Sequence, residues 1–182
     1  MLNDLFEKRR SYRAIEKIDI TDDMIKELAV AASKAPSCYN NQPWRFVFVR
    51  DEEQLKKLHP ALSKGNEWAY NGSLFIAVYA DRKSDCLVAG REYFLFDTGM
   101  SVMNILLKAV EMDLVVHPIA GYDESKFKEI LNIEDKYTLI TVIVAGKKAN
   151  QIPDSFTKEM IDMEKYPSPR KELNEIYSID KV

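Results

Sequence analysis

Residues 35–44 read APSCYNNQPW, in which one proline ends an apolar helical pattern, polar side chains follow, and a second proline precedes Trp44. Thr21 is a good N-cap, and apolar residues recur at helical spacing from Met24 to Ala35, so a helix is expected to stop at Pro36. Amide and hydroxyl groups held between two prolines can present donors and acceptors to a heteroaromatic ring. A helix-to-strand connection with Trp44 in the core explains the same residues, and taken alone the stretch favours that interpretation.

Apolar runs and helical patterns alternate on both sides of this loop. Residues 91–112 are apolar around most of the helix axis, which predicts a central, buried helix. No glycine-rich dinucleotide fingerprint follows a strand, so a Rossmann fold has no support. The class is mixed α and β. Strands are expected at 45–50, 74–79, 114–117 and 138–145, and further helices at 52–59, 124–131 and 171–177.

Composition limits the possible functions. The chain has 182 residues, of which 46% are hydrophobic and 30% charged, as expected for one globular domain. A net charge of -3 gives no general attraction to nucleic acid or to anionic membranes. The start of the chain has no apolar signal core, and no later run is apolar enough to span a bilayer. We therefore expect a cytoplasmic protein without nucleic-acid or membrane partners.

The few cysteines and histidines predict neither a disulfide framework nor a metal site. Cys38 and Cys86 are far apart in sequence and fit reduced thiols in a cytoplasmic protein. His59 and His117 are not at metal-ligand spacing with other ligand residues, so no metal is expected. The polar, proline-rich segment 151–170 is interpreted as an excursion of the chain.

The basic run Arg9-Arg10-Ser11-Tyr12-Arg13 is a candidate anion site. Guanidinium groups and a hydroxyl that alternate along an extended turn can converge on one phosphate. A solvated basic patch explains the same run about equally well.

Together the two stretches give a family resemblance, because R-R-S-x-R followed by A-P-S-x-x-N-x-Q-P-W is similar to the paired signature of nitroreductase-like FMN proteins. The resemblance continues through 74–81, the helix with Asp97, Gly99 and Asn104, and residues 117–123 and 169–173. It implies an α+β fold with a mixed, mainly antiparallel central sheet, flanking helices and a buried central helix. It also implies a homodimer of one domain, 1–182, in which the extension 151–182 packs on the partner subunit.

The same resemblance implies a bound FMN at the dimer interface. The basic residues would bind its phosphate and ribityl end, the loop after Pro36 would line the isoalloxazine ring of the partner's FMN, and the backbone before Tyr122 would approach the ring. Asn71-Gly72-Ser73 departs from the alanine-proline pair of many members, and no role carries over to Asn66. The implied cofactor-binding residues are Arg9, Arg10, Ser11, Arg13, Pro36, Ser37, Cys38, Asn40, Gln42, Pro118, Ile119, Ala120, Gly121, Arg170 and Lys171.

The activity implied is a ping-pong exchange. NADH or NADPH would reduce FMN and leave, and a nitroaromatic, quinone or flavin acceptor would then take the electrons. The flavin carries this chemistry, so no catalytic side chain is named. Two alternatives remain: a non-catalytic FMN-binding protein that stores flavin or transfers electrons, and a nucleic-acid module that uses the basic run. The acidic remainder of the chain weakens the second alternative.

Overall fold

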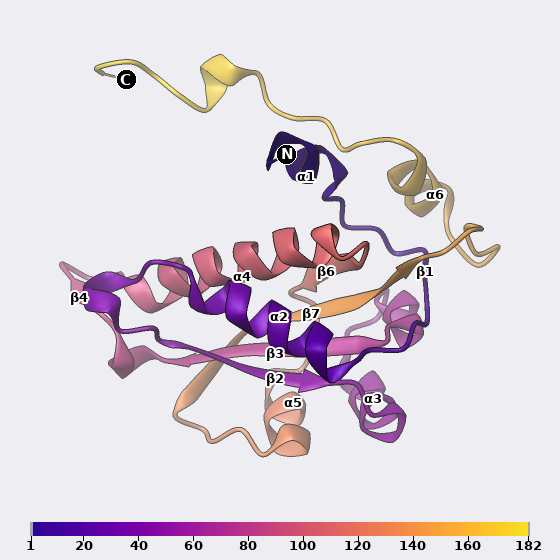
Figure 1. Ribbon diagram of the computed structural model, residues 1–182, viewed down its shortest axis with the longest axis horizontal. Helices are drawn as coiled ribbons and strands as arrows, with labels where there is room; N and C mark the ends of the chain where they lie inside the picture. Colours follow the sequence, from indigo (N-terminus) through magenta and orange to yellow (C-terminus); the bar gives the residue numbers. More distant parts are fainter. Residues whose placement is uncertain (1, 182) are drawn as a thin grey trace.

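The computed structural model describes residues 2–181 and has a five-stranded antiparallel sheet with helices on both faces (Figure 1). The strand order is β1-β7-β3-β2, and β6 pairs with β7 as well. The strands of this sheet are β1 (Ile15–Glu16), β2 (Trp44–Val49), β3 (Leu74–Asp81), β6 (Val115–Ile119) and β7 (Tyr137–Lys148), and a small hairpin joins β4 (Leu87–Val88) to β5 (Arg91–Glu92). The helices are α1 (Leu2–Lys8), α2 (Asp22–Ser33), α3 (Glu52–Leu58), α4 (Tyr93–Glu111), α5 (Glu124–Leu131) and α6 (Lys158–Lys165).

The alternating side chains of β3 divide the interior into two cores. Leu74, Ile76 and Val78 face α2 and α4, where they pack with Leu28 and Ile105. Phe75 and Ala77 point to the other face, which α3 and α5 cover (Figure 1). Since both faces of β3 are buried, its continuous apolar run is explained by its central place in the sheet.

Local capping fixes where the helices begin. Thr21 Oγ1 accepts a hydrogen bond from the Met24 N–H at the start of α2, as the sequence predicts. Asp51 and Asp123 cap α3 and α5 in the same way. The predicted α+β class and mainly antiparallel sheet are confirmed, although every strand pair of the sheet within residues 2–181 is antiparallel and not mixed as expected. Each predicted strand has both ends within three residues of those of the observed one.

Burial of the central helix α4 is one-sided in the single chain. Phe94, Ile105 and Ala109 are buried, the last two in the core between α4 and the sheet, but Leu95 and Phe96 are exposed, Phe96 by 63% of its surface. Apolar residues therefore surround the axis of α4 for two reasons. One face of the helix packs in the core, and the other face presents apolar side chains at the surface of the single chain.

The C-terminal segment differs from the sequence prediction. The helix expected at 171–177 is only a 3-10 turn, Leu173–Glu175, whereas α6 forms within the segment interpreted as an irregular excursion. Thr157 caps α6 through its side chain, a local signal that the proline-rich surroundings obscured. Beyond α6, residues 167–181 are exposed and extend past α1 away from the sheet (Figure 1).

Among residues 2–181, no helix combines the length and the apolar character needed to cross a membrane.

Candidate functional site

An arginine-lined pocket of about 690 Å³ lies between α1, the segment after it, β6 and the chain that follows α6. The size is within the range of small-molecule sites. Four arginines contribute to its wall, and each of them is among the cofactor-binding residues that the family resemblance implies. The lining residues are Phe6, Glu7, Arg9, Arg10, Ser11, Tyr12, Arg13, His117, Met163, Pro167, Ser168 and Arg170.

Among the described residues, 2–181, no carboxylate forms an ion pair with the guanidinium group of Arg9 or of Arg13. Arg9 Nη1 lies 3.4 Å from Ser11 Oγ, which turns the hydroxyl and the guanidinium toward one another. Within residues 2–181, Arg13 Nη1 reaches the thioether sulfur of Met163, at 3.3 Å, and it is the Arg13 backbone N–H that donates to the Glu164 carboxylate, at 2.6 Å. Clustered cations without an ion-pair partner repel one another, so an anion in this pocket would be stabilised strongly.

Arg10 differs from Arg9 and Arg13 because its guanidinium binds backbone carbonyls at the end of α6. Its Nη2 donates to the backbone carbonyls of Met163 and Glu164, at 2.8 and 3.3 Å, and also to that of Tyr166. Its guanidinium also lies over the Tyr12 ring, 4.7 Å from the centroid. Arg10 therefore holds the C-terminal end of α6 against the pocket.

A chain of contacts connects the pocket with the backbone at Gly121. His117 Nδ1 lies 3.1 Å from the Tyr12 carbonyl, and the imidazole packs on the Trp68 ring with centroids 4.7 Å apart. Trp68 Nε1 donates to Asn66 Oδ1, and Asn66 Nδ2 donates to the Gly121 carbonyl at 2.9 Å. The position of Gly121 is therefore coupled to the wall of the arginine pocket.

Burial keeps His117 neutral. It is 9% exposed, and desolvation lowers its pKa from the ordinary 6.5 to about 4, while the Tyr12 carbonyl opposes the shift and Arg13 and Arg9 add to it. Near pH 7 the ring is thus a neutral hydrogen-bonding group in a positively charged pocket.

This shift predicts a pH dependence of stability. Because the folded pKa lies below the unfolded value, the contribution of His117 is complete above pH 6.5 and is lost as pH falls through about 4. The loss is about 3 kcal/mol in total and about 2 kcal/mol between pH 7 and about pH 5. Urea unfolding of the apo protein at both pH values should show that His117→Gln loses less stability than the wild type. An equal loss in both proteins would contradict this assignment, and an NMR titration of the imidazole tests the pKa directly.

Gly121 is required by the approach of Asn66. A Cβ at position 121 would lie 2.6 Å from Asn66 Nδ2, closer than real Cβ atoms come to a neighbour, and 3.3 Å from Ser63 Cβ, which is a tight contact. The Gly121 carbonyl also accepts a hydrogen bond from the Ser63 N–H, at 3.0 Å. The glycine therefore lets Asn66 hold the chain that continues from β6.

We expect Gly121→Ala to destabilise the protein by about 1–3 kcal/mol, because the new methyl group displaces the Asn66 amide from the partly buried Gly121 carbonyl. Asn66→Ala breaks the same hydrogen bond without adding an atom, so a double-mutant cycle separates the two effects. Urea unfolding should show the double variant to be about as stable as the less stable single variant. Fully additive losses would rule out this coupling.

The loop after α2 has an unusual backbone. Tyr39, Asn40 and Gln42 all have positive φ, at 48, 57 and 49°, and none of them is a glycine. Such conformations cost free energy and are concentrated at functional sites. The Ser37 hydroxyl accepts from the Gln42 N–H at 3.0 Å and closes the loop, whereas the Tyr39 side chain is 92% exposed. The loop is thus held in one shape and presents Tyr39 outward.

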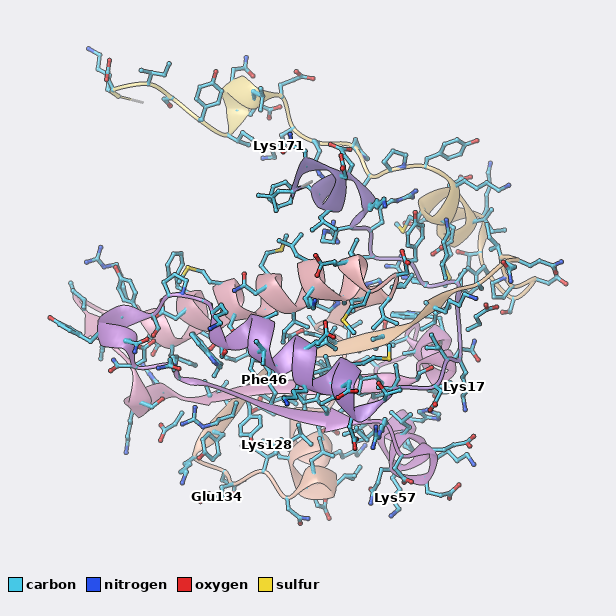
Figure 2. All side chains as sticks on the ribbon, viewed as in Figure 1. Lys17, Phe46, Lys57, Lys128, Glu134 and Lys171 are labelled. Atoms are coloured by element: carbon cyan, nitrogen blue, oxygen red, sulfur yellow. A yellow bond between two sulfur atoms is a disulfide. The ribbon has the colours of Figure 1, made fainter. Side chains whose placement is uncertain are left out.

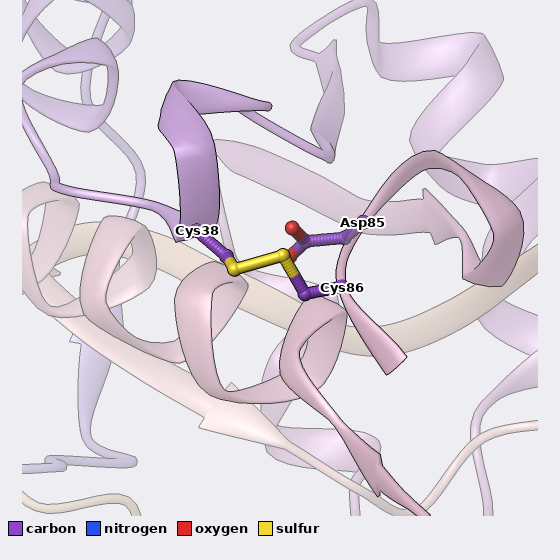
Figure 3. A group of neighbouring side chains, drawn as sticks. All are labelled: Cys38, Asp85 and Cys86. Carbon is purple, nitrogen blue, oxygen red and sulfur yellow. A yellow bond between two sulfur atoms is a disulfide. The ribbon is translucent and has the colours of Figure 1, made fainter. Parts of the chain in front are cut away.

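The prediction of reduced cysteines is wrong in this structure, because a disulfide joins Cys38 to Cys86 (Figure 3). The bond connects the loop after α2 to the chain before the β4–β5 hairpin, 48 residues later. Spacing in sequence gave no sign of this contact, since only the docking of the loop against the N-terminal part of α4 brings the two cysteines together. Cys38 N–H donates to the Asp97 carboxylate at 2.7 Å and fixes that docking.

Carboxyl groups surround the disulfide. Burial raises the pKa of Asp97 above its ordinary value, and the neighbouring Asp85 carboxyl raises it further, against the effect of the Cys38 N–H. Asp85 is held by Asn41 Nδ2 at 3.1 Å. A ligand atom from each of Cys38, Cys86 and Asp85 lies within 4.8 Å of the others, but bonded sulfurs are not thiolate ligands. The expected absence of a metal stays a prediction.

The sequence-predicted site residues thus form two groups. The pocket gathers Arg9, Arg10, Ser11, Arg13 and Arg170, and β6 with its continuation carries Pro118, Ile119, Ala120 and Gly121 away from it. The loop residues Pro36, Ser37, Cys38, Asn40 and Gln42 lie at the N-terminal end of α4, outside the pocket of the same chain. Lys171 is on the extended C-terminal segment above α1 (Figure 2), and it does not line the pocket.

Sequence reasoning missed Asn66, Trp68 and His117. His117 was considered only as a metal ligand, and Asn66 only by its spacing from the family pattern. The available signal was the sequence HPIAGYD at 117–123, which places a histidine directly before the stretch interpreted as approaching the ring.

Comparisons with known proteins agree with this architecture. A family model described as the nitroreductase family matches residues 6–87 and 64–147. A protein of Archaeoglobus fulgidus named "Putative NADH dehydrogenase/NAD(P)H nitroreductase" is 30% identical over 167 residues, which cover 87% of this chain and 94% of that protein. A crystal structure of an oxidoreductase containing FMN has 25% identity and a TM-score of 0.83 over 97% of this chain and 90% of its own. A nitroreductase family protein from Clostridium novyi NT has 25% identity and a TM-score of 0.76, over 82% and 86% of the two chains.

The sheet, the central helix and the arginine pocket therefore define an α+β protein with the nitroreductase fold. The chain belongs to the nitroreductase family.

Proposed function

We propose that this protein is an FMN-dependent NAD(P)H oxidoreductase. The observation that carries the proposal is the arginine pocket, in which the guanidinium groups of Arg9 and Arg13 have no carboxylate partner among residues 2–181. A phosphate is the kind of group that such a pocket binds.

The residues present fit FMN in charge and in length. In this proposal Arg9, Ser11 and Arg13 hold the phosphate, and Arg170 adds positive charge from the C-terminal segment. Arg10 keeps that segment in place through its bonds to the backbone after α6. From His117 to Gly121 four residues of nearly extended chain span roughly 13 Å, enough to separate a phosphate site from a ring site.

The second half of the site is proposed to come from another copy of the chain. The constrained loop 36–42 lies outside the pocket of its own subunit and presents the exposed Tyr39. Leu95 and Phe96 on α4 and Leu173 on the C-terminal segment are exposed apolar side chains that a partner would bury. A homodimer would thus bring the loop of one subunit to the FMN of the other, with 151–182 packed on the partner.

The bound FMN would accept a hydride from NADH or NADPH and pass the electrons to an acceptor such as a nitroaromatic compound, a quinone or a flavin. The protein would bind and orient both substrates and exclude water, and no side chain is assigned as a catalytic acid, base or nucleophile. We place the protein in the cytoplasm, although disulfides are rare there.

The first test is a visible absorption spectrum of the purified protein before and after anaerobic addition of NADH or NADPH. We expect a flavin spectrum that bleaches and returns when a quinone is added. A flavin spectrum that persists with both donors would favour the non-catalytic storage or electron-transfer alternative. A colourless protein that FMN does not reconstitute would refute the proposal.

A further inference from the structure

The arginine pocket contains mainly hydrogen-bond donors. Arg9, Arg10, Arg13 and Arg170 can only donate, and Glu7 is the one carboxylate among the described lining residues. A phosphate is satisfied by such donors, but a polyol also needs acceptors for its hydroxyl hydrogens.

His117 supplies an acceptor in this wall. A backbone carbonyl can only accept, so the hydrogen bond to the Tyr12 carbonyl places the proton of the neutral imidazole on Nδ1. Nε2 is then left with a lone pair, and it has no hydrogen-bond partner among residues 2–181. Since His117 lines the pocket, Nε2 is the polar atom that it can offer to a ligand.

The surroundings keep this acceptor available. Burial holds the pKa of His117 at about 4, with smaller effects from Arg13 and Arg9, so the lone pair is free of a proton near pH 7. Packing against Trp68 restricts the ring orientation, and Trp68 leads through Asn66 to Gly121. His117 thus lies between the arginines and the backbone proposed to face the flavin ring.

We propose that His117 is a positioning residue whose Nε2 accepts a hydrogen bond from the polyol chain of the flavin, and so selects ligands with hydroxyl groups between phosphate and ring. This inference rests on the proposed function.

Three ligands separate the contributions: FMN, riboflavin, which lacks the phosphate, and lumiflavin, which lacks the polyol as well. We expect His117→Phe to weaken FMN and riboflavin by the same factor, about tenfold, and to leave lumiflavin unchanged in fluorescence titrations. His117→Gln places an amide oxygen near the position of Nε2 and should restore most of the loss. Arg13→Ala is the matched comparison, because it should weaken FMN and leave riboflavin unchanged.

Failure of this inference and failure of the proposed function would give different results. An equal loss for all three ligands in His117→Phe, or none, would overturn the inference while leaving FMN binding by the wild type intact. Failure of the wild type to bind any of the three would overturn the proposed function together with it. Circular dichroism and thermal unfolding of apo His117→Phe establish that the variant is folded, and if it is not, the His117→Asn variant, which cannot reach the Nε2 position, takes its place.

Discussion

Replacing both Arg9 and Arg13 with alanine is expected to weaken FMN binding by about 10²- to 10⁴-fold. Each hydrogen bond from a guanidinium to a charged phosphate contributes about 1.5–3 kcal/mol, and each factor of ten in affinity corresponds to about 1.4 kcal/mol. Neither guanidinium has a carboxylate partner within residues 2–181, so its removal breaks no internal ion pair there. The fold should therefore survive while the cofactor is lost.

The measurement is flavin fluorescence titration of the apo double variant, with size-exclusion chromatography to follow the oligomeric state. A double substitution of Lys57 and Lys136 by alanine removes the same charge from exposed positions at α3 and just before β7, outside the pocket. It controls for a general effect of net charge and should bind FMN as the wild type does. Full FMN occupancy in the arginine variant would refute the assignment of the phosphate site.

Removal of the disulfide is the second large effect that we expect. The bond closes 48 residues, and in the chain-entropy treatment a loop of that size stabilises the folded state by about 4 kcal/mol. The double substitution of Cys38 and Cys86 by serine should therefore lower the free energy of unfolding by about 3–4 kcal/mol. Urea unfolding without reductant measures it.

The wild type treated with a reductant provides the matched control, because it lacks the bond but keeps both side chains. Its stability should fall to that of the double serine variant, which in turn should not respond to reductant. Alkylation of the unreduced, denatured wild type gives an independent test. Modification of both cysteines would mean that the purified protein does not contain the bond.

Local signals in the sequence were sufficient for most elements of the fold. The Thr21 cap and Pro36 delimited α2 because capping and proline geometry act within a few residues. The apolar run of β3 predicted an interior strand, since burial of both faces leaves no alternation of polar side chains. The C-terminal segment was mispredicted because its proline content masked the Thr157 cap of α6 and the pattern at 171–177 has no core to pack against.

The candidate site, like the fold, could be predicted from the sequence only in part. The sequence by itself determined the basic run at 9–13 and the glycine at 121, because charge and the absence of a side chain are properties of single residues. Only the tertiary structure decided that Arg9 and Arg13 have no ion-pair partner in the described part of the chain, residues 2–181. It also decided that Cys38 lies against Cys86, and that His117 is neutral with an Nε2 that no hydrogen bond from those residues occupies. Those properties depend on contacts between segments 48 or more residues apart and on burial, which no local pattern encodes.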